Sequence, residues 1–132
     1  MKKEMINPEE LYKHPAYARI VTVSEASKFH FIAGLTAADE KYKCVAPGNY
    51  LKQYYHIMES LDLCLKKVGA TWDDVVYRRI FVLNMDEFIK IQTDPSIKTW
   101  FTPGKFPPST LIEVRRLSDP EFLIEIDLLA VT

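Results

Sequence analysis

The chain has 132 residues, of which 48% are hydrophobic and 27% charged, a composition typical of a globular protein with one hydrophobic core. Its formal net charge of −1 argues against a general attraction to nucleic acid or to an anionic membrane. The charged N-terminal segment lacks the apolar stretch of a signal peptide, no apolar run could span a bilayer, and the two cysteines suggest no disulfide framework. We therefore expect one domain over residues 1–132, in a reducing, cytoplasmic setting.

The N-terminal third of the chain predicts a β-hairpin. Residues 1–16 are polar and predict no regular element. Tyr17–Ser24 is rich in β-branched residues, and Phe29–Ala33 alternates in the manner of a second strand, which ends at Gly34. We expect these two strands to pair with each other.

The clearest predicted helix lies between Asn49 and Gly69. Asn49 is a favoured N-cap residue, and Gly69 follows Val68 where a left-handed residue would end the helix. Apolar residues at three- and four-residue spacing form one stripe along it, comprising Leu51, Tyr54, Tyr55, Met58, Leu61 and Leu65. We expect this stripe to pack against a sheet.

The second half of the chain predicts a strand, a helix and a final hairpin. Residues 75–84 are apolar on both faces apart from two arginines, as in a strand that is covered on both sides. Asp86 is predicted to cap a short helix, and Ser96–Phe101 is a candidate continuation after an interrupting proline. The block Phe106–Val131 predicts two paired strands joined by a turn at residues 118–121.

The predicted order is β-β-α-β-α-β-β, which is typical of an α+β fold with two helices on one face of a mostly antiparallel sheet. On the second face, apolar residues such as Leu111, Leu123 and Leu129 would stay exposed in a monomer. Exposed apolar surface of that extent indicates an interface, and closed symmetry is its usual arrangement. We therefore expect a homo-oligomer.

The last predicted strand carries two carboxylates, Glu125 and Asp127, on one face. A carboxylate near an interface could act as an acid or base, or could position a water molecule. The alternative is a cross-strand ion pair between Glu125 and Arg115, which composition alone favours. The opposite face of the strand is apolar throughout and comprises Phe122, Ile124, Ile126, Leu128 and Ala130.

Other polar groups favour structural roles. Cys44 is a candidate reactive thiol, although only two lysines nearby could lower its pKa. Alternation sends Arg78 and Arg79 to opposite faces of their strand, so we expect solvated or ion-paired arginines rather than a basic patch. No metal site is expected, because no pair of histidines has metal-ligand spacing; the histidines are His14, His30 and His56.

Taken together, these segments resemble the Rid/YjgF family from Tyr17 to Val131. The resemblance rests on the hairpin, the helix ending at Gly69, the segment DDVVYRRIFVLNMDEF and the final FPPSTLIEVRRL and LIEIDLLAV, of which the last block is the most specific. It implies a chorismate-mutase-like α+β fold and a homotrimer with a site in each cleft between subunits. For the best-known branch it also implies hydrolysis of reactive enamines and imines, with no cofactor or metal.

The resemblance further implies site residues. Tyr17 falls at the family's early-strand active-site tyrosine, and Gly34 falls at the glycine after the second strand. Glu125 falls at the glutamate that orients the attacking water. These three positions match the deaminase branch.

Other positions depart from that branch. Ser109 stands where the branch has the arginine that grips a substrate carboxylate, and a hydroxyl cannot replace a guanidinium there. Ala33 stands where a serine precedes the glycine, and Gln92 stands near the asparagine of the second helix. Arg19, two residues beyond the matched tyrosine and on its face, is the better candidate to stand in for the missing arginine.

Two hypotheses follow from the resemblance. In the first, the chain is a Rid-type deaminase with altered substrate choice, in which Glu125 orients water, Tyr17 lines the pocket, and Ser109 and Thr110 contact the substrate. In the second, it is a non-catalytic trimer that binds a small metabolite in the inter-subunit clefts, as loss of both the arginine and the serine would favour. The ribonuclease activity sometimes ascribed to the family is disfavoured by the neutral charge and the lack of a basic groove.

Overall fold

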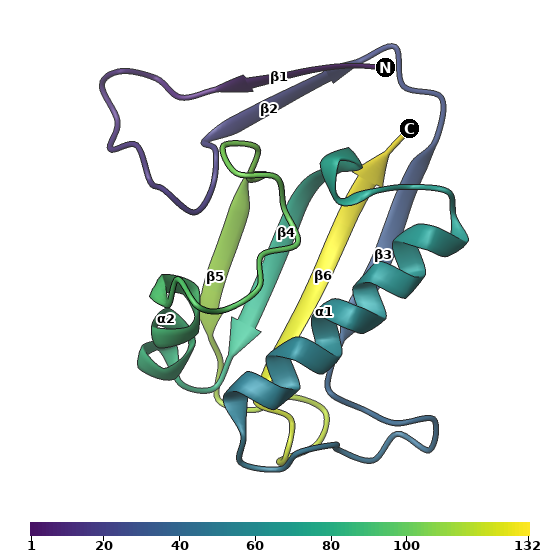
Figure 1. The fold of residues 1–132 in the computed structure, drawn as a ribbon, viewed down its shortest axis with the longest axis vertical. Helices are drawn as coiled ribbons and strands as arrows, with labels where there is room; N and C mark the ends of the chain where they lie inside the picture. Colours follow the sequence, from purple (N-terminus) through teal and green to yellow (C-terminus); the bar gives the residue numbers. More distant parts are fainter.

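The computed structural model describes residues 1–132 as a four-stranded sheet, a two-stranded sheet and two α-helices (Figure 1). The strands are β1 (Lys2–Ile6), β2 (Ile20–Ser24), β3 (Phe29–Leu35), β4 (Val75–Val82), β5 (Ser109–Glu113) and β6 (Ile124–Val131). The helices are α1 (Tyr50–Lys67) and α2 (Met85–Thr93), and a 3₁₀ turn, Trp72–Asp74, precedes β4. The predicted α+β class is confirmed. Neither helix is long and apolar enough to cross a membrane.

The main sheet has the order β3-β6-β4-β5, with β6 antiparallel to both of its neighbours and β5 parallel to β4. The predicted hairpin within Phe106–Val131 is therefore wrong, because β4 lies between β5 and β6. The connection over residues 114–123 is far longer than a tight hairpin loop, so it does not force its two strands to be neighbours.

The predicted N-terminal hairpin is also wrong. β2 pairs with β1, a strand that the polar N-terminal segment did not predict, and β3 pairs with β6 instead. Figure 1 shows the β1–β2 ribbon lying across one end of the main sheet. Tyr17 and Arg19 precede β2 and lie in the loop between β1 and β2, not on a strand face.

The helix α1 confirms its predicted ends. The Asn49 side chain accepts a hydrogen bond from the backbone N–H of Lys52, and Gly69 has a φ of +75°, which favours glycine. The buried face is rotated from the predicted stripe, since Leu51 is 40% exposed. The buried residues of α1 are Gln53, Ile57, Met58, Leu61 and Leu65.

The helix α2 begins two residues earlier than predicted. Asn84, not Asp86, is its N-cap, and the Asn84 side chain accepts a hydrogen bond from the backbone N–H of Glu87. The candidate continuation over Ser96–Phe101 is wrong, because that segment forms turns and irregular structure. The first N–H groups of a helix have no partner within the helix, and the Asn84 side chain accepts one of them. Asp86 therefore lies inside the first turn, where a negative charge is favourable.

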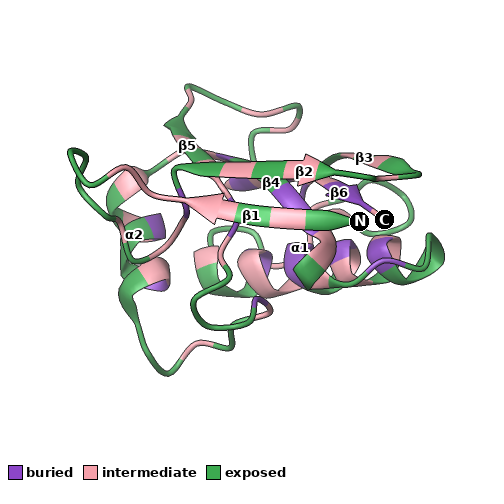
Figure 2. Ribbon diagram, turned by 90° about the horizontal axis from the view of Figure 1, so that it is seen from above, coloured by how far each residue is buried: buried purple, intermediate pink, exposed green.

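The core lies between α1 and the inner face of the sheet, where the buried residues of Figure 2 gather. The predicted apolar face of β6 is confirmed, since Phe122, Ile124, Ile126, Leu128 and Ala130 are all buried. Leu111 and Leu123 also pack against this core, so their predicted exposure is wrong. The exposed apolar residues of the outer face are instead Phe29, Phe31, Tyr77 and Ile112.

One buried amide joins α1 to two loops. The side-chain nitrogen of Gln53 donates to the carbonyls of Ala46 and Glu121, at 3.2 and 3.0 Å, and its oxygen accepts from the backbone N–H of Leu123 at 2.9 Å. Gln53 has no exposed surface. These bonds hold the loop before α1 and the loop before β6 on the same helix.

We predict that Gln53→Leu lowers the free energy of unfolding by about 2–4 kcal/mol, because each buried polar group left without a partner costs about 1–3 kcal/mol. Chemical denaturation followed by circular dichroism measures the change. Glu59→Leu, on the exposed face of the same helix, is the matched control and should change stability by less than about 1 kcal/mol. Equal losses in the two variants would contradict the assigned role of the amide.

Candidate functional site

The two carboxylates of β6 lie on the outer face of the sheet and have different partners. Asp127 forms a salt bridge with Arg79 of β4, with Oδ2 2.7 Å from Nη2, and also accepts from the Arg79 Nε and backbone N–H. The predicted ion pair between Glu125 and Arg115 is wrong, because β5 is not adjacent to β6 and Phe81 is opposite Glu125. Asp127 is thus neutralised by a neighbouring cation.

Glu125 has no such partner. None of the four salt bridges includes it, and no side chain of the structure donates a hydrogen bond to its carboxylate. Its side chain lies against the backbone of Gly34, since a Cβ added to that glycine would stand 2.5 Å from Oε2. Gly34 is therefore required by the close approach of the carboxylate, and not by a left-handed backbone. No side chain of the structure therefore occupies the lone pairs of this carboxylate.

Thr110 belongs to the same outer face. Its hydroxyl is 2.7 Å from the hydroxyl of Tyr77, on the neighbouring strand β4. Ala33 precedes Gly34 on β3 and is exposed. The outer face thus combines a free carboxylate with a hydroxyl pair, bordered by exposed apolar side chains.

A cavity of about 660 Å³ lies on the other side of the sheet, next to α2 and the N-terminal loop. Arg78 forms part of its wall and is only 8% exposed. The Arg78 Nε donates to the Ser109 hydroxyl at 3.0 Å, Nη2 donates to the Ala16 carbonyl at 3.2 Å, and the guanidinium lies 4.9 Å from the ring centroid of Phe101. The expectation of a solvated or ion-paired Arg78 is therefore wrong. Burial lowers the pKa of its guanidinium.

The N-terminal loop covers one side of this cavity. His14 lines the cavity and stacks on Tyr17, with ring centroids 4.4 Å apart. The His14 Nδ1 accepts the backbone N–H of Ala16 at 3.0 Å, so a neutral ring carries its proton on Nε2. The guanidinium of Arg19 donates to the carbonyl of Tyr12 at 2.9 and 3.2 Å, which ties down the same loop.

The sheet divides the predicted site residues into two groups. Gln92 lines the cavity, Ser109 holds the arginine in its wall, and Tyr17 supports His14. Glu125, Gly34 and Thr110 lie on the outer face instead, and Arg19 lies in the covering loop. Within one chain the structure does not bring Glu125 together with Ser109 or Gln92. Their roles in binding or catalysis stay predictions.

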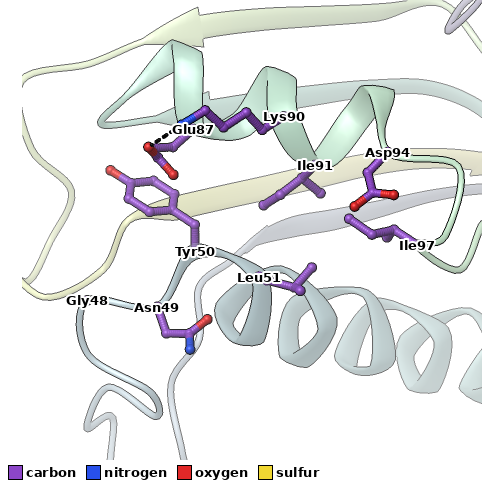
Figure 3. Close-up of a pocket in the computed structure, with 9 residues that line it drawn as sticks. All are labelled: Gly48, Asn49, Tyr50, Leu51, Glu87, Lys90, Ile91, Asp94 and Ile97. Carbon is purple, nitrogen blue, oxygen red and sulfur yellow. Dashed lines mark hydrogen bonds and ion pairs between the residues drawn. The ribbon is translucent and has the colours of Figure 1, made fainter.

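A second hollow of about 320 Å³ lies where the start of α1 faces α2 (Figure 3). Its charged groups already have partners. Lys90 forms a salt bridge with Glu87 at 3.1 Å, Asp94 accepts hydrogen bonds from Ser96, and the Asn49 amide caps α1. The hollow therefore offers no charged group without a partner.

Cys44 does not fit the role of a nucleophile. Burial and the neighbouring carboxylates Glu121 and Asp119 raise the pKa of its thiol, which disfavours the reactive thiolate. No three side chains of His, Cys, Asp or Glu gather in a way that could hold a metal ion.

Arg78 is the functional candidate that the residue patterns failed to indicate. Residues 75–84 were expected to form a strand covered on both faces, and an arginine inside such a strand is expected to be buried. That pattern could have indicated Arg78. The sequence does not show the hydrogen-bond partners of Arg78. In the folded chain its guanidinium donates to the Ser109 hydroxyl and to a backbone carbonyl, and not to a carboxylate.

The family described as endoribonuclease L-PSP matches residues 10–132 of the chain. The chain is 27% identical over 126 residues to the 3-aminoacrylate deaminase RutC of Acinetobacter baylyi, which covers 96% of this chain and 95% of that protein. It is 29% identical over 107 residues to the RutC family protein slr0709 of Synechocystis, covering 80% of each. The crystal structure of YyfB from Yersinia pestis, a Rid-family protein of unknown function, matches with a TM-score of 0.87 at 27% identity, over 100% of both chains.

We predict that Gly34→Ala displaces the Glu125 carboxylate and lowers the free energy of unfolding by about 1–3 kcal/mol, because the new Cβ would overlap Oε2. Thermal or chemical unfolding measures the change. The same substitution made in a Glu125→Ala background is expected to cost much less, since the overlapping atoms are gone. An equal cost in both backgrounds would show that the contact does not require the glycine.

Proposed function

The chain belongs to the endoribonuclease L-PSP family, the Rid/YjgF proteins, and from that premise we propose that it hydrolyses reactive enamines or imines and releases ammonia. The relative named as a 3-aminoacrylate deaminase supports this class of reaction. The single observation that carries the proposal is the free Glu125 carboxylate, held against Gly34 while the adjacent Asp127 is paired with Arg79.

The reaction needs a group that handles the protons of water. An enamine first takes a proton on carbon to give its imine, and water then adds to the C=N carbon. The Glu125 carboxylate would accept the proton of that water as the C–O bond forms, and would return it to nitrogen. In the resulting carbinolamine the hydroxyl proton then moves to nitrogen as the C–N bond breaks and the C=O bond forms, which releases ammonia and leaves a carbonyl product. No redox step or cofactor enters this balance.

The substrate would differ from that of the deaminase branch. Ser109 stands at the position of the branch's carboxylate-binding arginine but carries no positive charge. Its hydroxyl already accepts a hydrogen bond from Arg78. Gln92 and Tyr17 would line the ligand site, and Thr110 would contact the substrate. We propose altered substrate choice on these grounds.

A site formed between subunits would bring the two groups of residues together. We propose a homotrimer in which the outer face of one subunit, with Glu125, meets another subunit. Phe31 and Phe29, which are 80% and 60% exposed on β3, support such an interface, because large apolar side chains rarely gather on the free surface of a monomer.

We predict that Glu125→Gln lowers the rate of ammonia release from freshly generated 2-aminoacrylate or 3-aminoacrylate by about 10²–10⁴-fold, because the amide cannot accept the proton of water. Ammonia is measured over the buffer rate. Asp127→Asn, which changes the paired carboxylate two residues away, is the matched control and should retain most of the activity. Activity that survives in Glu125→Gln would remove the proposed role, and a wild-type chain inactive on all enamines and imines would remove the function.

A second candidate function is non-catalytic binding of a small metabolite, which the size of the Arg78 cavity favours. Thermal-shift screening against keto acids and aromatic compounds separates the two functions. Stabilisation without turnover indicates binding alone, whereas ammonia release that depends on Glu125 indicates the deaminase.

We predict that Phe31→Glu dissociates the trimer, because it would bury a charge in an apolar contact. Analytical ultracentrifugation measures the mass of the species present. Leu63→Glu, which changes an equally large exposed apolar residue on α1, should leave the assembly intact. A wild-type chain that sediments as a monomer would contradict the proposal.

A further inference from the structure

Arg78 is a buried cation without an acidic partner. It is the only charged residue in the buried set, and none of the salt bridges includes it. Arginine keeps its charge in proteins, so a guanidinium taken out of water without a counter-ion is unfavourable. The lowered pKa of Arg78 reflects this burial. An anion that reached the guanidinium would offset the unfavourable desolvation.

One end of the guanidinium remains open to the cavity. Nε and Nη2 each donate one hydrogen bond, to Ser109 and to the Ala16 carbonyl, whereas Nη1 donates none within the chain. No buried side-chain nitrogen of the structure lacks a partner, so Nη1 has access to open space. The cavity that Arg78 lines is that space. The Nη1–Nη2 edge can therefore donate to two oxygens of one ligand.

The walls of the cavity suit an apolar or aromatic body. They include Tyr54, Phe88, Trp100, Phe101 and Phe106, which come from α1, α2 and the loop that leads into β5. A volume of about 660 Å³ lies within the range of small-molecule sites.

The other polar groups of the cavity complete its charge balance. His14 and Gln92 offer hydrogen-bonding groups, and Lys98 adds a second cation, which lies over Trp100. Asp94 is the one carboxylate among the lining residues, and it accepts hydrogen bonds from Ser96. The two cations thus exceed the single anion in the cavity.

We propose that this cavity binds a small organic carboxylate with an apolar or aromatic body, and that Arg78 pairs with the carboxylate group. Ser109 is then a positioning residue, because its hydroxyl holds Nε and directs the Nη1–Nη2 edge toward the ligand. The guanidinium comes from β4, one strand away from Ser109 on β5. The proposal concerns binding alone and does not depend on the proposed hydrolysis.

The first test compares two ligands on the unaltered full chain. Titration calorimetry is carried out with 3-phenylpropanoate and with its primary amide, which has nearly the same shape but no charge. We expect the carboxylate to bind at least about tenfold more tightly, because a charged acceptor strengthens the hydrogen bonds of the guanidinium. Equal affinities, or no binding of the carboxylate, would overturn the proposal.

The second test uses two adjacent arginines. Arg78→Met should weaken binding of 3-phenylpropanoate at least about tenfold, whereas Arg79→Met, on the outer face of the same strand, should change it by less than about threefold. Circular dichroism checks that both variants fold. Arg78→Lys retains the charge but loses the planar fork, so an intermediate affinity is expected. Equal weakening by Arg78→Met and Arg79→Met would contradict the assignment.

The binding test and the hydrolysis test have separate outcomes. Binding of 3-phenylpropanoate is measured by calorimetry and hydrolysis is measured by ammonia release, so each proposal has a readout of its own. If hydrolysis fails and the carboxylate still binds through Arg78, only the proposed function is lost. If binding shows no dependence on Arg78, this inference is lost whatever the result for hydrolysis.

Discussion

The structure depends on the central position of β6, whose two faces have opposite chemistry. Ile124, Ile126 and Leu128 are buried under α1, while Glu125 and Asp127 alternate with them on the outer face. Since β6 pairs with β3 on one side and β4 on the other, it decides which residues of both neighbours face the core. A register shift of one residue would bury the two carboxylates, which is why this strand tolerates only one arrangement.

The same alternation separates the chemistry of the chain. On the outer face, Arg79 neutralises Asp127 and leaves Glu125 free beside Gly34. On the inner side, Arg78 is buried beside a cavity, and no carboxylate of the chain pairs with its guanidinium. A carboxylate on one side and a guanidinium on the other cannot act on one small molecule within a single chain. A catalytic site that uses both would need a second subunit, whereas a binding site at Arg78 needs only one.

The role of Ser109 depends on the neighbouring residue Arg78. In the sequence, Ser109 stands where the deaminase branch has an arginine. In the structure, its hydroxyl accepts a hydrogen bond that orients the Arg78 guanidinium on the adjacent strand. Introducing arginine at residue 109 would therefore remove that acceptor and put a second cation beside a buried one, which is unfavourable. Residue 109 and residue 78 must accordingly be considered as a pair, since each sets the environment of the other.

Local patterns in the sequence determined the α+β class, the ends of α1 and the inner face of β6, because caps and side-chain periodicity depend on residues close together in the chain. The family resemblance likewise pointed to Glu125 as the carboxylate of interest. Only the tertiary structure decided which strands are neighbours, because the long connection between β5 and β6 leaves room for β4 to lie between them. The tertiary structure alone also decided the partners of Asp127 and Arg78, because each partner is close to its residue in space but far from it in the sequence.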